Sequence, residues 1–134
     1  MKKRIIKILE KYNSKEDGIC VSMDIEEYAK KLINSAVILT YDEKNKIAFI
    51  AFYANNTNVK IGFLSMLLVD TDLRGIGIGN MLLKQAEEIL KAKGFNKFQL
   101  DVLCKNAKAF SFYKRNGFYE LSRNKNFIKM QKDI

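Results

Sequence analysis

Three glycines at alternate positions form the most informative segment of the sequence, Arg74-Gly75-Ile76-Gly77-Ile78-Gly79. A strand-like run precedes this segment, and an amphipathic helical pattern follows it from Asn80. Glycines at such a junction let the backbone approach a ligand closely, and the first N–H groups of a helix have no partners inside the helix. These groups attract phosphate oxygens. The segment therefore predicts a site for a phosphorylated ligand.

The spacing of the glycines narrows the choice of ligand. A Walker A loop needs a lysine and a hydroxyl residue after its last glycine, and no such pair follows Gly79. A dinucleotide-binding loop needs GxGxxG, but the sixth position counted from Gly75 is Asn80. Neither common nucleotide motif fits. A glycine turn that binds nothing remains the alternative for these six residues taken alone.

The sequence contains no histidine and only two cysteines, Cys20 and Cys104, which lack CxxC spacing. This composition excludes most zinc sites and every Ser-His or Cys-His catalytic arrangement, so we expect no metal. Any general base must be a carboxylate, a tyrosine, or a water molecule held by one of them.

Length and composition predict one globular domain over residues 1–134, with 48% hydrophobic and 29% charged residues. The net charge of +9 suits an anionic partner. The basic residues are scattered, however, and no aromatic-basic motif accompanies them, so we expect a solvated lysine-rich surface and no nucleic-acid partner. The basic start, MKKRIIKILEKY, has no continuous apolar stretch, which predicts a cytoplasmic protein without a membrane span.

Periodicity predicts the elements that must position the glycine loop. Residues 47–54 are apolar on both faces, as expected for a central strand with helices on both sides. The fold class is therefore α/β (α+β), with a mixed central sheet flanked by helices. Helices are predicted over 3–12, 25–34 capped by Asp24, 80–93 ended by Gly94, and 107–115 capped by Asn106. Strands are predicted over 36–41, 47–54, 59–69, 97–104, 118–121 and 127–130, with a turn over 42–46.

Two motifs together resemble the GCN5-related N-acetyltransferase (GNAT) family. The first is [Q/R]xxGx[G/A], which fits Arg74, Gly77 and Gly79, with Thr71 where the family usually has proline. The second, N-x-x-A-x-x-[FL]-Y-x-x-x-G-F, matches residues 106–118 at every named position. The resemblance covers residues 62–118 and implies a GNAT fold, with two central strands that splay apart. Family members usually begin with a strand, whereas this sequence begins with a predicted helix, so that first strand is expected to be absent.

The resemblance implies acetyl-CoA as the acyl donor. Backbone groups of residues 67–69 would bind the pantetheine arm in the gap between the splayed strands, where unpaired strand groups need partners. Residues 74–80 would hold the pyrophosphate, and Asn106 would contact the donor, cap the following helix, or do both. The implied donor-binding residues are Leu67, Leu68, Val69, Arg74, Gly75, Ile76, Gly77, Ile78, Gly79, Asn80 and Asn106.

The resemblance also supplies two catalytic candidates. Tyr113 occupies the family position that protonates the departing thiolate, although it could also be a core tyrosine beside Phe110. Asp101 lies five residues before Asn106, on the strand face away from Phe98, where some members that acetylate protein N-termini have glutamate. It could remove a proton from the amine through a water molecule, or it could simply pair with a neighbouring lysine.

The acceptor cannot be read from the sequence. In the family it binds between two loops that correspond here to residues 14–23 and 121–126, whose charges are mixed in sign. We expect transfer of acetyl, by direct attack, to a primary amine of a small molecule, amino sugar or peptide. The alternative is a non-catalytic acyl-CoA sensor or interaction module of the same fold. Either a monomer or a homodimer fits the sequence.

Overall fold

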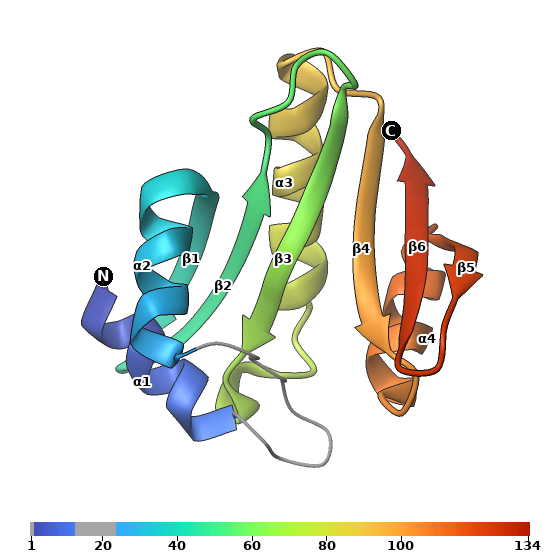
Figure 1. Cartoon of the computed structure of the whole chain (residues 1–134). Coiled ribbons are helices and arrows are strands. Elements are labelled where there is room, and N and C mark those ends of the chain that lie inside the picture. Colours follow the sequence, from blue (N-terminus) through green and yellow to red (C-terminus); the bar gives the residue numbers. More distant parts are fainter. Residues whose placement is uncertain (1, 13–23) are drawn as a thin grey trace.

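The computed structural model describes residues 2–12 and 24–134, which form one six-stranded sheet with helices on both faces (Figure 1). The helices are α1 (Lys2–Tyr12), α2 (Ile25–Ser35), α3 (Ile78–Ala92), α4 (Ala107–Arg115) and the short 3-10 helix η1 (Thr71–Leu73). The strands are β1 (Val37–Glu43), β2 (Lys46–Tyr53), β3 (Ile61–Val69), β4 (Lys97–Leu103), β5 (Tyr119–Arg123) and β6 (Phe127–Asp133). The mixed α/β fold predicted from the sequence is confirmed.

The strands lie in the order β1-β2-β3-β4-β6-β5, and every neighbouring pair is antiparallel except β3 and β4. Helices α1 and α2 pack on one face of the sheet, whereas α3 and α4 pack on the other. The first element of the described residues is helix α1.

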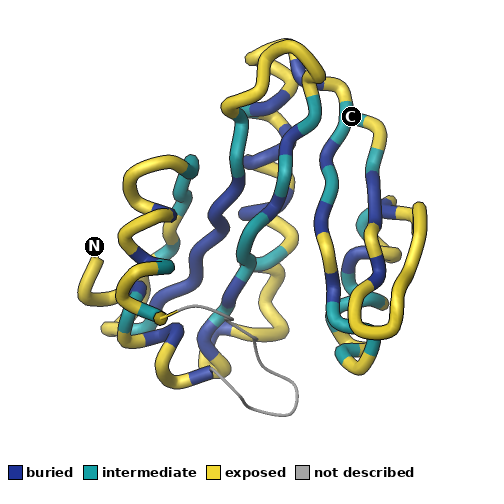
Figure 2. The backbone as a smooth tube through the Cα atoms, viewed as in Figure 1, coloured by how far each residue is buried: buried dark blue, intermediate teal, exposed yellow. Residues whose placement is uncertain are grey.

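Strand β2 is the centre of both hydrophobic layers. Ile47, Phe49 and Ala51 face α1 and α2, while Ile50 and Phe52 face α3. Figure 2 shows β2 buried along nearly its whole length, as predicted from its two apolar faces. Burying both faces fixes β2, and β3 pairs with it along most of its own length.

Strands β3 and β4 pair at one end and separate at the other. Their parallel pairing runs only from Ile61↔Lys97 to Leu64↔Leu100, although β3 continues to Val69 and β4 to Leu103. Beside the last pair, β3 has a bulge: Ala51 pairs with Met66 and Phe52 with Leu64, which leaves Ser65 as the extra residue. A bulge bends its strand and increases the local twist. The splay expected from the family resemblance is therefore present, and Figure 1 shows the two strands diverging.

Several element ends differ from the sequence prediction. The turn between β1 and β2 is two residues, Lys44 and Asn45, because both adopt the left-handed conformation that a tight hairpin needs. Strand β3 begins at Ile61, after a turn in which Lys60 also has a positive φ of 56°. Helix α3 begins at Ile78 rather than at Asn80. The predicted caps are confirmed: Asp24 and Asn106 accept backbone N–H groups, and Gly94 has a φ of 84°.

Candidate active site

A cavity of about 770 Å³ lies where β3 and β4 separate. The end of β3, the glycine loop, the start of α3 and one face of α4 line it. It brings together nearly all the residues that the sequence assigned to donor binding, and also Tyr113. These residues are Leu67, Leu68, Val69, Arg74, Gly75, Gly77, Ile78, Gly79, Asn80, Asn106 and Tyr113. Ile76 and Asp101 do not line the cavity, and the side chain of Ile76 is exposed.

The glycine loop has the backbone of an anion cradle. Gly75 and Gly77 have φ values of 82° and 84°, and an added Cβ at either would meet nothing within 4 Å. The first hydrogen bond inside α3 runs from the N–H of Met81 to the carbonyl of Gly77 at 3.0 Å. The N–H groups of residues 78–80 therefore have no partner in the helix and lie beside the cavity. Their arrangement fits a phosphate group.

Gly79 has an ordinary φ, and a Cβ there would lie 3.4 Å from the ring of Phe112 on α4. Helices α3 and α4 therefore approach each other closely around the cavity. The side-chain amide of Asn116 donates to Asn80 Oδ1 at 3.0 Å and strengthens the same contact.

Helix α4 adds cavity residues that the sequence analysis did not assign. Lys108, Phe112 and Arg115 line the cavity at spacings of four and three residues, which places them on one face of the helix. Two of the three are basic, so this wall favours an anionic ligand. The spacing was visible in the sequence, but only the fold shows that this face turns toward the glycine loop.

Tyr113 is buried in the core and also reaches the cavity. Its side chain is 8% exposed, and its ring packs edge-on against Phe112 and Phe118 at 5.3 and 5.6 Å between centroids. Burial raises the pKa of its hydroxyl, which keeps the phenol protonated at neutral pH. Tyr113 also lines the cavity. Its place in the core is confirmed, whereas its role as the acid stays a prediction.

Asp101 lies on the opposite face of the sheet from Tyr113. Its neighbours Leu100 and Val102 point into the layer under α3 and α4, so Asp101 points away from that layer. It lines a separate cavity of about 260 Å³ together with Ser122, Arg123, Asn124, Phe127 and Lys129. Lys129 is its partner in the strand register, but the two side chains do not form an ion pair. The predicted strand face is therefore confirmed, whereas the role of Asp101 as a base stays a prediction.

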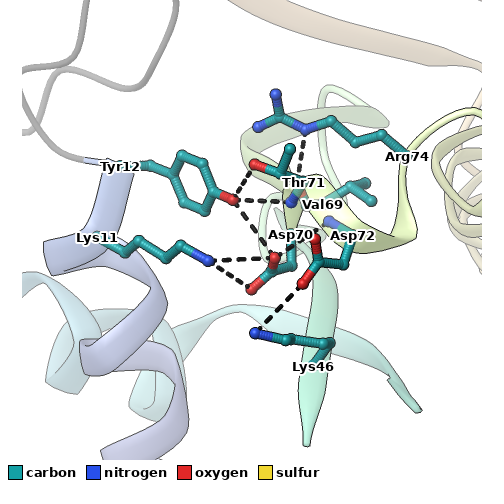
Figure 3. A network of polar contacts seen from close by, with 8 residues as sticks. All are labelled: Lys11, Tyr12, Lys46, Val69, Asp70, Thr71, Asp72 and Arg74. Carbon is teal, nitrogen blue, oxygen red and sulfur yellow. Dashed lines mark hydrogen bonds and ion pairs between the residues drawn. The ribbon is translucent and has the colours of Figure 1, made fainter. Parts of the chain in front are cut away.

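A polar network supports the segment that leads into the glycine loop (Figure 3). Asp70, at the end of β3, is 6% exposed and accepts hydrogen bonds from Lys11 Nζ at 3.3 Å and from the N–H of Asp72. Burial opposes the charged carboxylate, but these hydrogen bonds outweigh it and lower the pKa of Asp70. The sequence analysis missed this network because Lys11 and Asp70 are 59 residues apart.

In the part of the chain that the structure describes, no three His, Cys, Asp or Glu side chains cluster in a way that could hold a metal ion. None of its helices is long and apolar enough to cross a membrane. The predicted acceptor loop at residues 14–23, which includes Cys20, lies outside the described residues.

Two curated proteins to which the chain is similar are both named as N-acetyltransferases. Over 105 residues the chain is 32% identical to spermidine N(1)-acetyltransferase of Thermoplasma acidophilum, covering 69% of this chain and 63% of that protein. Over 68 residues it is 41% identical to an uncharacterized N-acetyltransferase of Methanocaldococcus jannaschii, covering 51% of this chain and 30% of that protein. The chain thus spans less than two thirds of the length of either relative.

A solved structure extends the likeness to nearly the whole chain. The PaiA N-acetyltransferase of Thermoplasma acidophilum, in complex with coenzyme A, superposes with a TM-score of 0.81 at 23% identity, covering 99% of this chain and 92% of that one. At this identity the likeness concerns the fold. The sequence itself matches the acetyltransferase (GNAT) family over residues 3–118, which is most of its length. The chain therefore belongs to the acetyltransferase (GNAT) family.

Proposed function

We propose that this protein transfers the acetyl group of acetyl-CoA to a primary amine. The observation that carries this proposal is the single cavity that joins a glycine cradle, an open strand edge and Tyr113. A phosphate cradle alone would fit many ligands. Joined to the unpaired edge of β3, it fits a ligand with a pyrophosphate at one end and an amide-bearing arm at the other.

The donor would lie along two surfaces of this cavity. The N–H groups at the start of α3 would hold its pyrophosphate, with Arg74, Lys108 and Arg115 adding positive charge. The amides of the pantetheine arm would pair with backbone groups of residues 67–69, which β4 leaves unpaired. The thioester would then reach the point where the two strands diverge.

The reaction would proceed by direct attack. The lone pair of the amine forms a C–N bond with the thioester carbonyl, and the resulting oxyanion is stabilised by backbone N–H groups near Leu68. Breaking the C–S bond then releases coenzyme A as a thiolate, which takes a proton from the Tyr113 hydroxyl. The amine loses one proton before attack and a second as the amide forms. One of these protons passes through water to Asp101, and the other restores Tyr113.

The position of Asp101 suits an acceptor that enters from the face opposite α3 and α4. Helices α1 and α2 pack over β2 and β3 on that face, and the apolar cluster they form includes no residue of β4 or β6. The small cavity around Asp101 lies over β4, β5 and β6, and Asp101 directly follows Leu100, the last β4 residue that pairs with β3. The relatives named for acetylation of spermidine and of an alanine of ribosomal protein S18 support an amine acceptor, in a small molecule, amino sugar or peptide.

The donor site can be tested with two matched glycine substitutions. Gly77 and Gly94 share a φ of +84°, and a Cβ at either would meet nothing within 4 Å. Gly77→Glu and Gly94→Glu should therefore destabilise the fold by similar amounts, about 1–2 kcal/mol. Only Gly77→Glu places a negative charge in the cradle. We expect acetyl-CoA to raise the melting temperature of the wild type and of Gly94→Glu by several degrees, and to leave Gly77→Glu unchanged.

The measurement is a thermal melt with and without excess acetyl-CoA, together with titration calorimetry. An equal ligand shift in both variants would place the donor elsewhere. No shift in the wild type would contradict the proposal as a whole.

A further inference from the structure

We propose that Tyr12, the last residue of α1, is a positioning residue of the donor site. Its side chain contacts the turn at residues 70–74 (Figure 3). It thereby holds the turn so that the glycine loop presents its N–H groups to the pyrophosphate. The inference rests on the proposed function, since it concerns how that site is kept ready to bind. Tyr12 itself does not line the cavity and acts through Thr71 and Arg74.

The hydroxyl of Tyr12 fixes the beginning of the turn. It accepts a hydrogen bond from the N–H of Thr71 at 2.7 Å and makes a short contact with the Thr71 hydroxyl. It also lies 3.4 Å from Oδ1 of Asp70, to which it can donate. The side chain of Tyr12 is only 4% exposed, so these contacts are made largely away from solvent. In such surroundings hydrogen bonds are held firmly, and losing one leaves its partner unsatisfied.

The ring of Tyr12 fixes the end of the turn. The guanidinium carbon of Arg74 lies 5.1 Å from the ring centroid, within the range of a cation–π contact. Nε of the same side chain donates to the carbonyl of Val69 at 2.9 Å. Arg74 therefore connects the last residue of β3 to α1, and the turn at residues 70–73 lies between these two attachments. Gly75 directly follows Arg74, and Gly77 comes two residues later, so the path of the glycine loop depends on the position of Arg74.

Charge pairs hold the same turn from two directions. Lys11 pairs with the buried carboxylate of Asp70, and Lys46, at the start of β2, pairs with Asp72 at 3.3 Å. The backbone N–H of Asp70 also donates to the carbonyl of Ile47 at 3.2 Å. The sheet thus supports one side of the turn, and α1 supports the other. Tyr12 is the only one of these residues that contacts both ends of the turn.

We expect the contacts that hold the turn to strengthen donor binding. The glycines of the loop have the greatest conformational freedom of any residue, and ordering them on binding would weaken affinity. A loop already held in its binding conformation avoids that cost. The benefit falls on the pyrophosphate, which the loop contacts, and not on the pantetheine arm, which lies against β3.

The experiment measures dissociation constants of the full chain for two probes, coenzyme A and pantetheine, which lacks the pyrophosphate. The variants are Tyr12→Phe, which removes the hydroxyl and keeps the ring, and Tyr12→Leu, which removes both. Tyr28→Phe is the control, because its hydroxyl likewise joins a helix of the same layer to β3, at Ser65 Oγ at 2.7 Å, away from the turn. We expect coenzyme A affinity to fall roughly threefold to tenfold in Tyr12→Phe and more in Tyr12→Leu. Pantetheine affinity should not change.

The outcomes separate this inference from the proposed function. If the wild type binds coenzyme A but Tyr12→Phe and Tyr12→Leu bind it equally well, the positioning role is wrong and the donor site stands. Equal losses for both probes, or the same loss in Tyr28→Phe, would indicate general destabilisation and would also overturn the role. If the wild type binds no coenzyme A, the proposed function fails and this inference fails with it. Tyr12→Phe keeps the shape of the side chain, so the test remains valid if Tyr12→Leu does not fold.

Discussion

At the scale of single residues, the three glycines of the loop differ in their surroundings. Gly75 and Gly77 supply a left-handed backbone, whereas Gly79 has an ordinary φ and lies against Phe112 of α4. The alternate spacing of the glycines in the sequence marks these positions equally. It could predict that the loop binds phosphate, because backbone N–H groups at a helix start do so in any context. It could not predict which glycine does what, because that depends on α4, about 30 residues further along the chain.

Tyr113 is expected to act as the proton donor of the reaction. Burial raises the pKa of its hydroxyl, so the group is a proton donor, not a base, at neutral pH. Tyr113→Phe should lower kcat by about 10²–10⁴-fold, the usual contribution of a positioned acid. The dissociation constant of coenzyme A should stay within about twofold, because the ring and its contacts with Phe112 and Phe118 remain. Steady-state kinetics and calorimetry provide both numbers.

Unchanged turnover in Tyr113→Phe would leave the tyrosine as a core residue only. If the wild type binds coenzyme A but turns over no amine in a broad library, the protein is better explained as a sensor of acyl-CoA.

Asp101 carries a second prediction, for the other half of the reaction. Asp101→Asn keeps the size of the side chain and removes its ability to accept a proton. We expect kcat/KM for the amine to fall at least tenfold at neutral pH and to recover partly at higher pH, where more of the amine is already deprotonated. Coenzyme A binding should be unaffected, since Asp101 lines a different cavity. A pH–rate profile of both proteins tests this, and parallel profiles without a rate difference would leave Asp101 without a catalytic role.

At the scale of elements, the positions of helices and strands could be predicted, but several of their ends could not. Sequence patterns identified the six strands and four α-helices of the described residues, and most of these elements bury one or two faces, although all five residues of β5 are exposed. The hairpin turn was predicted too long, because Lys44 and Asn45 adopt left-handed conformations that residue type alone only weakly favours. The splay between β3 and β4 followed from the family resemblance. Its physical cause, a bulge at Ser65, has no clear signature in the sequence.

The packing of α3 on β3 carries a prediction of its own. A Cβ at Gly62 would lie 2.7 Å from both terminal carbons of Leu90, which is fully buried. Gly62→Ala should therefore destabilise the protein by about 1–3 kcal/mol, as overpacking usually does. Leu90→Ala should cost about 2–5 kcal/mol by leaving a cavity. In the double variant the added methyl group has room, so its cost should vanish or change sign.

Urea unfolding of the four proteins measures this coupling. If the two changes in the free energy of unfolding simply add in the double variant, close packing against Leu90 of α3 is not the reason for a glycine at position 62.

At the scale of the whole molecule, α1 belongs to one hydrophobic layer while its last residues contact the segment before the glycine loop. Ile5, Ile8 and Leu9 bury α1 against the sheet, and Lys11 and Tyr12 reach the turn before the glycine loop. The sequence predicted the helix over residues 3–12 from its apolar spacing. It could not predict the polar partners, because a pairing across nearly 60 residues leaves no local pattern. Stability of the fold and order of the donor site are therefore linked.

Acid stability gives the prediction that tests this link. The pKa of Asp70 is lowered: burial would raise it, but hydrogen bonds from the Asp72 N–H and from Lys11 outweigh burial. The folded state thus binds this proton less readily than the unfolded state. The stabilisation is fully present above the ordinary pKa of an aspartate, about 3.9, and is lost as the pH falls through the lower folded value.

Asp70→Asn should accordingly be less stable than the wild type at pH 7, and the difference in stability should shrink as the pH falls below the ordinary pKa of an aspartate. Denaturant midpoints between pH 7 and pH 2.5 provide the test. Asp133 and Glu120 also have lowered pKa values, from their pairs with Lys97 and Arg123, so the wild type and the variant should share part of the acid sensitivity. Only the difference in stability between the wild type and Asp70→Asn reports the contribution of Asp70. A difference that stayed constant down to pH 2.5 would mean that Asp70 stabilises the turn by packing alone. A difference that disappears in acid would mean that its charge holds α1 to the donor loop.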